Sequence, residues 1–441
     1  MKTLISIFFL VFLFSNVFAD DEIVVEWEKK FDNGDYTTIP KTIVQTNDGG
    51  FAITARTYKQ DESVYPYRYD NDTWVIKLDS NGNKQWDIIF GKNLDLDSQA
   101  SFNSIVQTSD DGFTIVGMKE KVILVVRLDK NGNRLWEKNI PEYSTEYDGI
   151  PVNVNSITQI PDNKIVVVGT FFSKVNRNDI NLIFIKLDNN GNKLLEKVFY
   201  SNDSYNINYN RAIIQTIDSG FILLNGIFMK NSGFQNAFGD NILTINSLII
   251  KLDNNGNQQW NKIIGGNYWD ETYSIIQTTD KGFAIVGDTN IGKYNVLHNT
   301  DAWILKLDMD ANQQWEKIFG SLENFYNPIG NAYSIIQTSD GEFLIAGQMD
   351  HQGSQDLWLI KLNKDGTLKW ENFFGEKYPS AEYANSIIQT SDGGFAVVGH
   401  VNNEHNKGIW LIKFKNSDYI NPIGNLIPNI RIEPTTLRFS Q

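Results

Sequence analysis

Trp27-Glu28-Lys29-Lys30-Phe31 stands alone near the start of the chain, although it has the sequence of the closing segment of a repeat. Complete copies of that repeat, such as residues 274–319, end in the similar segment 314–319, Gln-Trp-Glu-Lys-Ile-Phe. The pattern occurs seven times, and the seventh copy lacks this closing segment. A linear array has no reason to move one strand from its last repeat to its front, whereas in a closed ring the first strand can complete the last repeat. The sequence therefore predicts a ring.

Each repeat predicts four short strands, because it contains four runs of β-branched and aromatic residues bounded by Gly, Asp and Asn. The first run carries a glutamine, at Gln45, Gln107, Gln159, Gln215, Gln277, Gln337 and Gln389. Six residues later an apolar anchor opens the second run, at Phe51, Phe113, Ile165, Phe221, Phe283, Phe343 and Phe395. The links between runs one and two, and between runs three and four, have the Gly and Asx composition of tight turns. We predict an all-β fold, a seven-bladed β-propeller of four-stranded blades over residues 20–415, with the last blade closed by the N-terminal strand, residues 24–31.

The two ends of the chain differ from the repeat. Residues 1–19 combine a charged start, a short apolar core and a small-residue exit at Ala19, which predicts a cleaved secretory signal. We therefore expect a secreted or cell-surface protein, and no later run is long enough to predict a membrane-spanning helix. Residues 416–441 contain three prolines and predict either a linker into an incomplete further β domain or a tail laid along the propeller.

Composition excludes some partners. The chain has a formal net charge of −14 and its arginines are scattered, so binding to a phosphate backbone is not expected. It has no cysteine, so the fold must be stabilised by a large core and not by disulfides. We expect a monomer.

The sequence of the repeat, for example residues 265–315, resembles the secreted β-propeller repeat families of bacterial and archaeal cell-surface proteins. Asp301-Ala302-Trp303 and the hairpin pattern Lys-Leu-Asp-x-Asn-Gly-Asn-x-x-Trp carry the resemblance, which covers roughly residues 24–415. It implies an extracellular, surface-associated protein. It supplies no catalytic residues, because these families are defined by structural repeats.

Several repeated polar positions have a structural interpretation. The seven glutamines can satisfy backbone groups between neighbouring blades, or form a ring for a ligand near the axis. The repeated Lys or Arg of the third run can pair with the acidic residue after the Trp or with an Asp of the adjacent turn. Asp79-Ser80-Asn81-Gly82-Asn83 resembles the start of a calcium loop but lacks its spacing and its distant Glu, so a turn is expected. We predict no metal and no cofactor.

The candidate site lies where the repeats differ, because function is usually carried by variable loops on a rigid scaffold. The loops between strands two and three, and between strands four and one, vary in length and are rich in aromatic residues. One position of the repeat lies five residues after the apolar anchor. It carries a charged, amide or imidazole side chain in four copies and none of these in the other three. From these features we predict a ligand-binding site at Arg56, Tyr67, Tyr268, Trp269, Asp288, Gln348 and His400.

Two functions fit these residues. The first is a non-catalytic binding or scaffolding module that recognises an extracellular glycan or protein, since aromatic anchors suit both. The alternative is a carbohydrate-active hydrolase or lyase in which Asp288, His400 and Arg56 supply acid–base and charge-stabilising groups. A sialidase is not favoured, because the arginines form no cluster in the sequence that could hold an acidic substrate. The aromatic residues can also serve only to pack the loops onto the disc.

Overall fold

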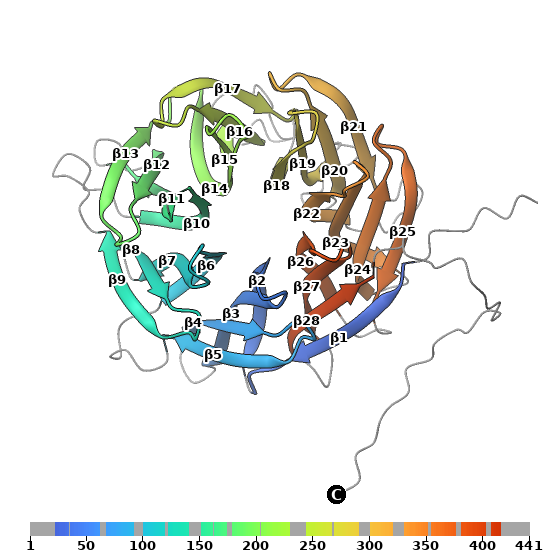
Figure 1. Cartoon of the computed structure of the whole chain (residues 1–441). Helices are drawn as coiled ribbons and strands as arrows, with labels where there is room; N and C mark the ends of the chain where they lie inside the picture. The colour runs from blue at the N-terminus through green and yellow to red at the C-terminus, as the bar shows by residue number, and fades with distance from the viewer. Residues whose placement is uncertain are drawn as a thin grey trace, which may run out of the picture.

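The computed structural model describes residues 23–34, 36–61, 68–91, 100–119, 122–140, 151–161, 163–173, 179–202, 204–229, 244–266, 269–290, 300–320, 330–351, 354–375, 381–402 and 407–415. Within these ranges the protein is built from strands and contains no helix, and it forms a β-propeller (Figure 1). The expected signal at residues 1–19 and the expected linker at 416–441 lie outside the described residues.

Five of the sheets have four strands each and follow the chain order from the inside of the ring to its rim (Figure 1). They are β2 (Thr37–Gln45), β3 (Phe51–Asp61), β4 (Arg68–Leu78) and β5 (Lys84–Phe90); β6 (Ala100–Gln107), β7 (Phe113–Lys119), β8 (Val122–Leu128) and β9 (Arg134–Ile140); β10 (Pro151–Ile160), β11 (Lys164–Phe172), β12 (Ile180–Leu187) and β13 (Lys193–Phe199); β14 (Tyr205–Gln215), β15 (Phe221–Met229), β16 (Thr244–Leu252) and β17 (Gln258–Ile264); and β18 (Asp270–Gln277), β19 (Phe283–Thr289), β20 (Asp301–Leu307) and β21 (Gln313–Phe319).

The remaining sheet has eight strands. It contains β22 (Gly330–Gln337), β23 (Phe343–His351), β24 (Ser354–Leu362) and β25 (Leu368–Phe374), followed by β26 (Ala381–Gln389), β27 (Phe395–Asn402), β28 (Lys407–Phe414) and β1 (Val25–Phe31). A single parallel pair, Gln355 with Ala381, joins β24 to β26. All other pairs in the sheet are antiparallel neighbours of the kind found in the five smaller sheets.

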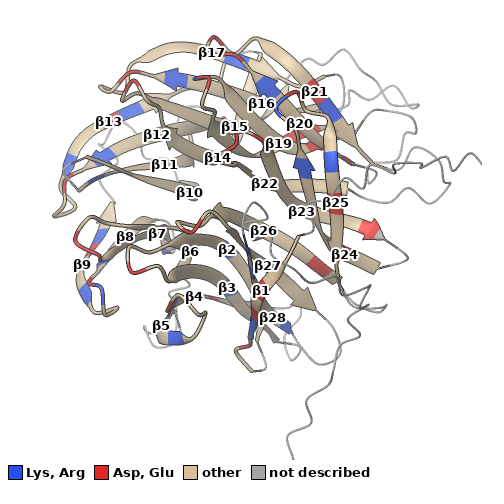
Figure 2. Ribbon diagram, turned by 45° about the vertical axis from the view of Figure 1, so that its right-hand side comes forward, with Lys and Arg blue, Asp and Glu red and all other residues tan. Residues whose placement is uncertain are grey.

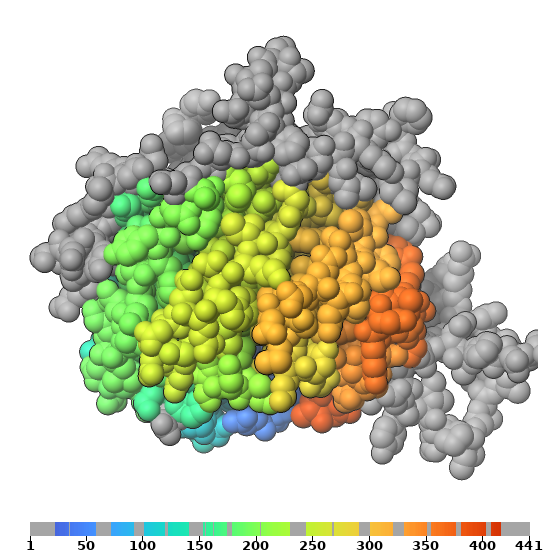
Figure 3. Space-filling model, turned by 90° about the horizontal axis from the view of Figure 1, so that it is seen from above, coloured from blue at the N-terminus to red at the C-terminus, as the bar shows by residue number. Residues whose placement is uncertain are grey.

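The core lies between the faces of neighbouring sheets. One cluster, for example, packs Ile43, Phe51 and Trp74 of the β2–β5 sheet against Val398 and Leu411 of β27 and β28. Because the middle strands of each sheet are covered on both faces, they are buried along almost their whole length and do not alternate between buried and exposed residues. Seen edge-on, the sheets stand side by side along the rim (Figure 3).

The ring is closed by β1, which pairs antiparallel with β28 as the sequence predicts. Lys30 lies opposite Trp410, and the Trp410 indole donates to Glu28 Oε2 at 2.9 Å. On its other side β1 contacts the β2–β5 sheet, where the Trp27 ring lies edge-on to Phe51 at 5.8 Å. Trp27 also covers Gly82, where an added Cβ would meet the ring at 2.7 Å. The first strand therefore holds the last sheet by hydrogen bonds and the first sheet by packing.

The repeated glutamines link neighbouring sheets, which confirms the structural interpretation for four of them. Each accepts a backbone N–H from the turn of the preceding sheet at 2.8 Å, and its own amide donates to a carbonyl of the following turn. The four acceptors are Gln45, Gln107, Gln277 and Gln337. Gln45 accepts from Ser391, so this bond also closes the ring.

Five of the seven repeated basic residues pair with the aspartate of the turn between the first two strands, which decides between the two alternatives for these five. The pairs are Lys77 with Asp48, Arg127 with Asp110, Lys251 with Asp218, Lys306 with Asp280 and Lys413 with Asp392. Within the described residues Lys186 binds Asn254, and Lys361 lies closer to Glu342 than to Asp340. The acidic residue after the Trp has a different partner, since Glu316 and Glu371 accept from the indoles of Trp303 and Trp358. Figure 2 shows other Lys and Arg residues on the outer strands β9, β21 and β25.

The Asp-x-Asn-Gly-Asn segments are turns, as expected. Asp79 Oδ1 accepts the backbone N–H of Asn81 at 2.9 Å and of Asn83 at 2.8 Å, and Gly82 has a φ of +75°. These bonds lower the pKa of Asp79, the backbone N–H of Asn83 first. The Asp79 carboxylate therefore stabilises the turn by accepting its backbone N–H groups. Among the described residues no group of three or more His, Cys, Asp or Glu is arranged to hold a metal ion.

One outer strand departs from the pattern at Leu195, where most other copies have tryptophan. In the neighbouring copy the Trp136 ring covers Gly191, and its indole donates to the carbonyl of Asn189 at 3.1 Å. Leu195 covers Gly256 in the same way but is smaller, and a pocket of about 280 Å³ opens beside it, lined by Lys186, Leu195 and Asn254 among others.

Deleting residues 23–32 should destabilise the whole ring, because the last sheet loses its outer strand and Gly82 loses the ring that covers it. We expect a large fall in melting temperature in a thermal unfolding experiment. Trp27→Ala removes only the packing and should lower the free energy of unfolding by about 2–4 kcal/mol. A deletion variant that melts at the temperature of the parent would contradict the closure.

Leu195→Trp should fill the gap beside Gly256 and raise the free energy of unfolding by about 0.5–2 kcal/mol in chemical denaturation. The matched reverse change, Trp136→Leu, should lower it by about 1–3 kcal/mol. If both substitutions changed the free energy of unfolding in the same direction, the aromatic ring would not be what stabilises the packing of the outer strand on the turn of the next sheet.

Candidate functional site

A β-bulge occurs at the same place in every innermost strand. In each case one residue is left out of the pairing with the second strand, four residues before the repeated glutamine. These residues are Lys41, Asn103, Asn155, Arg211, Tyr273, Tyr333 and Asn385. Bulges re-aim side chains and are frequent beside functional sites. The side chains at the bulges, next to the axis, therefore differ between sheets. They are charged or aromatic in some sheets and uncharged amides in the others.

A second row of residues lies beside the bulges. The residue two before each bulge pairs with the residue five after the apolar anchor, which is the position that the sequence singled out. The pairs that contain predicted site residues are Ile39 with Arg56, Glu271 with Asp288, Asn331 with Gln348, and Tyr383 with His400. Four of the predicted site residues thus occupy equivalent places in neighbouring copies of the repeat.

The expected setting of these residues was wrong in one respect. We predicted a site on variable loops, but Arg56, Asp288, Gln348 and His400 lie in the strands β3, β19, β23 and β27. Asp288 and His400 are 3% and 4% exposed, because the second strand of each sheet is covered on both faces. Trp269 lies just before β18 and is 38% exposed. Tyr67 and Tyr268 lie outside the described residues.

Glu271 organises one end of the site. It forms an ion pair with Arg211 and accepts from the Tyr209 hydroxyl, while its Oε2 accepts from the Trp269 indole at 3.2 Å. The Arg211 guanidinium lies over the ring of Tyr209 at 4.0 Å and over that of Tyr273 at 4.8 Å. Cation–π contacts of this kind and the ion pair fix the arginine in one place.

Aromatic rings continue from this cluster along the innermost strands. Tyr273 lies edge-on to Tyr333 at 5.2 Å, Tyr333 to Tyr383 at 6.5 Å, and Tyr383 lies against His400 at 5.2 Å. We call Tyr273, Tyr333, Tyr383 and His400 the aromatic arc. The three tyrosines are half-buried, so each ring keeps some exposed surface. His400 Nδ1 lies 2.8 Å from the carbonyl of Thr38 in β2, which anchors the end of the arc to the first sheet.

Asp288 is held by two donors behind the arc. Its Oδ2 accepts from the Tyr273 hydroxyl at 3.0 Å and from the Asn331 amide at 2.8 Å. Its Oδ1 is buried and has no hydrogen-bond partner within the described structure. Burial raises the pKa of Asp288 to about 7, because a charged carboxylate is poorly solvated there.

Asp288 and His400 do not form an acid–base pair. No hydrogen bond joins them in the described part of the chain, and Tyr273, Tyr333 and Tyr383 separate them along the arc. Proton transfer between two groups requires hydrogen-bond reach, directly or through one water. Burial also lowers the pKa of His400, so the imidazole is neutral at neutral pH.

Sequence reasoning missed the bulge residues Lys41, Tyr273 and Tyr333, and it judged the arginines to be scattered. The structure brings Arg56 and Arg211 to the surroundings of Lys41, where burial first, and then the charges of both arginines, lower the pKa of the lysine. A signal for these residues existed, since each stands four residues before a repeated glutamine and the type at that place varies between copies.

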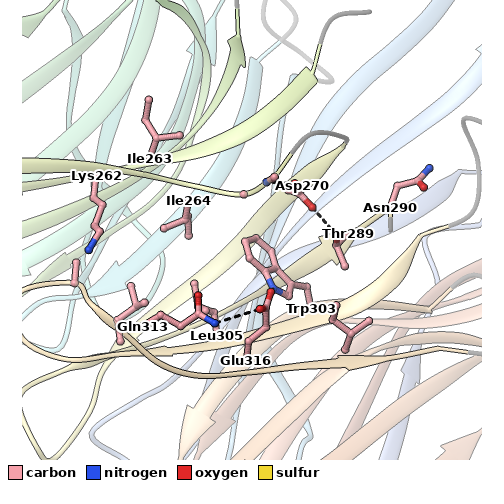
Figure 4. Close-up of a pocket in the computed structure, with 15 residues that line it drawn as sticks. Lys262, Ile263, Ile264, Asp270, Thr289, Asn290, Trp303, Leu305, Gln313 and Glu316 are labelled. Carbon is pink, nitrogen blue, oxygen red and sulfur yellow. Dashed lines mark hydrogen bonds between the residues drawn. The ribbon is translucent and has the colours of Figure 1, made fainter. Parts of the chain in front are cut away.

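A pocket of about 490 Å³ lies elsewhere, between β17 and the β18–β21 sheet (Figure 4). It opens beside Ile264, which ends β17 where β1, β5, β13, β21 and β25 end in phenylalanine. Its carboxylates already have donors: Asp270 accepts from Thr289 and from the backbone of Gly266, and Glu316 from the Trp303 indole at 2.6 Å. The smaller side chain at Ile264 explains this pocket, and we assign no ligand to it.

Comparisons with known proteins agree with the fold. Residues 160–193 match the model of a family described as a domain of unknown function (DUF5122), beta-propeller. A search of curated proteins finds no match. In the described ranges no helix is long and apolar enough to cross a membrane.

Solved structures with a similar arrangement have low sequence identity. One is a protein of unknown function from Dyadobacter fermentans, with 11% identity and a TM-score of 0.50; the match covers 89% of this chain and 99% of that one. Another is Drosophila Semaphorin 2a, with 9% identity and a TM-score of 0.51, covering 88% of this chain and 75% of that one. Likeness at this level shows the propeller fold alone.

Asp288→Asn should make the fold less sensitive to pH. An aspartate whose pKa is raised from 3.8 to about 7 in the folded state makes the fold lose stability as pH rises through that window. The asparagine variant should therefore gain stability relative to the parent, by about 2–4 kcal/mol between pH 4 and pH 7, and the difference should stay constant above that. Urea unfolding of both proteins across the window measures this; a difference independent of pH would contradict it.

Proposed function

We propose that this chain is an extracellular, non-catalytic binding or scaffolding propeller at a microbial cell surface, which recognises a glycan or a protein at the aromatic arc. The ring is proposed to have seven blades. The seven copies of the repeat support this count, as do the five four-stranded sheets and an eight-stranded sheet whose two halves are joined at one parallel pair.

The aromatic arc is the observation that carries the proposal. It places half-buried tyrosine rings in one continuous row on rigid strands, and Asp288, Asn331 and Glu271 hold the side chains at one end in position. Rings fixed in this way lose little conformational freedom on binding, which favours recognition. The apolar faces suit sugar rings or the side chains of a protein partner.

Extracellular location rests on the sequence. The predicted secretory signal and the resemblance to surface-associated propeller families support it. The family match over residues 160–193 supports a propeller and gives no ligand.

A carbohydrate-active hydrolase or lyase is the second candidate, and the raised pKa of Asp288 favours it, because a general acid needs a proton at neutral pH. Binding is supported better, because the described residues offer Asp288 no second acid or base within hydrogen-bond reach.

Screening the mature protein and a Tyr333→Ala variant on a glycan array, and against proteins of a cell-envelope extract, tests the proposal. Loss of the central ring of the arc should weaken binding of the recognised ligand about tenfold or more, since aromatic anchors are often worth over 2 kcal/mol. The matched control is Tyr200→Ala, a tyrosine that follows the outer strand β13 and is 56% exposed.

Binding that survives Tyr333→Ala would place the ligand elsewhere. Turnover of a bound glycan by the parent protein, abolished by Asp288→Asn, would replace the binding module with the hydrolase.

A further inference from the structure

Trp269 differs from the other tryptophans of this protein. The chain has 11 tryptophans, and the rest are buried or half-buried, as where the Trp86 ring covers Gly132. Trp269 is 38% exposed. Since burying an aromatic ring is strongly favourable, this exposed ring is an exception in a fold that buries the others.

Trp269 is also fixed in place. Its backbone carbonyl accepts the N–H of Asn290 at 2.9 Å, and its backbone forms an isolated parallel bridge with Ile245 of the preceding sheet. Its indole N–H donates to Glu271 Oε2 at 3.2 Å. The polar group of the side chain therefore has a partner, while part of the apolar ring is in contact with water. A ring held in this way has little conformational freedom to lose when a ligand covers it.

Contacts join Trp269 to the aromatic arc. Glu271 forms an ion pair with Arg211, and the Arg211 guanidinium lies over the Tyr273 ring at 4.8 Å. Trp269 precedes β18, an innermost strand, at the end opposite the repeated turn 278–282 (Figure 1). Four residues of strand span about 13 Å, so the two aromatic contacts, Trp269 and Tyr273, are separated by roughly this length along β18.

The surroundings of Trp269 favour a sugar over a protein surface. A protein partner needs an aromatic anchor within a larger apolar patch that excludes water. Among the described residues none of the other exposed large apolar side chains lies on an innermost strand; Leu135, for example, is on β9 and Ile263 on β17. A sugar ring has one small apolar face and a hydroxyl edge, so a single exposed aromatic ring beside a carboxylate suits it.

We propose that Trp269 is a second contact for the ligand of the aromatic arc, and that this ligand is a glycan chain of several sugars. One sugar stacks on Trp269 while others of the same chain contact Tyr273 and Tyr333. A single sugar ring is shorter than the separation of the two contacts, so only a chain reaches both. This inference rests on the proposed binding function and narrows its ligand to one class with a minimum length.

Titration calorimetry with length series of neutral oligosaccharides tests the inference. Neutral sugars are suitable probes because Arg211 and Glu271 neutralise each other beside the arc. The series run from monosaccharide to hexasaccharide and are built of β-1,4-glucose, of β-1,4-N-acetylglucosamine and of α-1,6-mannose. At least one series should gain about tenfold or more in affinity between its shortest and its longest member, since the longer chain adds a second aromatic anchor.

Substitutions at Trp269 separate the two contacts. Trp269→Ala should reduce the affinity of the hexasaccharide to that of the short members and leave the short members, which bind at the arc, unchanged. Trp269→Phe should keep much of the gain with length, because it keeps an aromatic ring. Phe172→Ala is the matched control, since Phe172 at the end of β11 is 37% exposed, and it should bind every member like the parent.

Tryptophan fluorescence gives a second readout. Acrylamide should quench the exposed Trp269 in the ligand-free protein, and the bound hexasaccharide should protect it from quenching. Trp269→Phe should abolish this protection. If Trp269 only supports Glu271, Trp269→Ala would lower the melting temperature and leave the affinities of all members unchanged, and that result would overturn the inference.

The two proposals fail in different ways. If a series binds through Tyr333 without any gain with length, or if only an envelope protein binds through Tyr333, the glycan chain is wrong and the binding module stands. If all three series fail and an array glycan of several sugars binds, its loss in both Tyr333→Ala and Trp269→Ala supports the chain, and its loss in Tyr333→Ala alone overturns it. If no series member, array glycan or envelope protein binds, or if binding ignores Tyr333→Ala, both proposals are wrong.

Discussion

The pairing of β1 with β28 is the contact on which the rest of the structure depends. Apart from the single parallel pair of β24 with β26, the other described strands pair within their own repeat, so those sheets form from local segments. The joint between the first and last sheets is the only place where residues from opposite ends of the described chain must meet. There the Glu28–Trp410 and Gln45–Ser391 hydrogen bonds and the packing of Trp27 on Gly82 act together. Since each sheet packs between two neighbours, the closed ring leaves none of the apolar faces at this joint open to water.

This closed scaffold explains how a site can be built on the strands themselves. The glutamine amides and the lysine–aspartate pairs repeat around the ring and fix the turns on one side of the disc. The bulges come four residues before the glutamines, so they are equally spaced and equally well held. The protein varies the residue at the bulge, from Lys41 to Arg211 to Tyr333, without changing the backbone that presents it. The same hydrogen bonds and ion pairs therefore support an inner surface whose side chains differ from one sheet to the next.

Much of this was predictable from the sequence, and the rest was not for identifiable reasons. The strands, the turns, the partner of β1 and the role of the glutamines follow from short-range patterns that repeat in the printed sequence. The sequence could not show whether Lys77 pairs with Asp48 or with the acidic residue after the Trp, because both lie within reach of the third strand. Only the three-dimensional structure distinguishes the two. The bulges were missed because a register shift of one residue leaves no mark in composition. Arg56 and Arg211 are far apart in sequence and come together near Lys41 only because the ring is round. Placing His400 on a loop failed because the second strand, here β27, extends further than the apolar run in the sequence indicates and ends only at Asn402.

The topology that closes the ring also sets an order of events during synthesis. Of the described strands β1 leaves the ribosome first and β28 last, so β1 has no partner in its own chain until all the other described strands have been made. Contacts of such long sequence separation form late in folding. In that interval the edge of β1 offers the same hydrogen bonds to β28 of a second copy as to its own. Exchange of this strand between two chains would give a linked pair of rings in which the contacts of β1 with β28 are preserved.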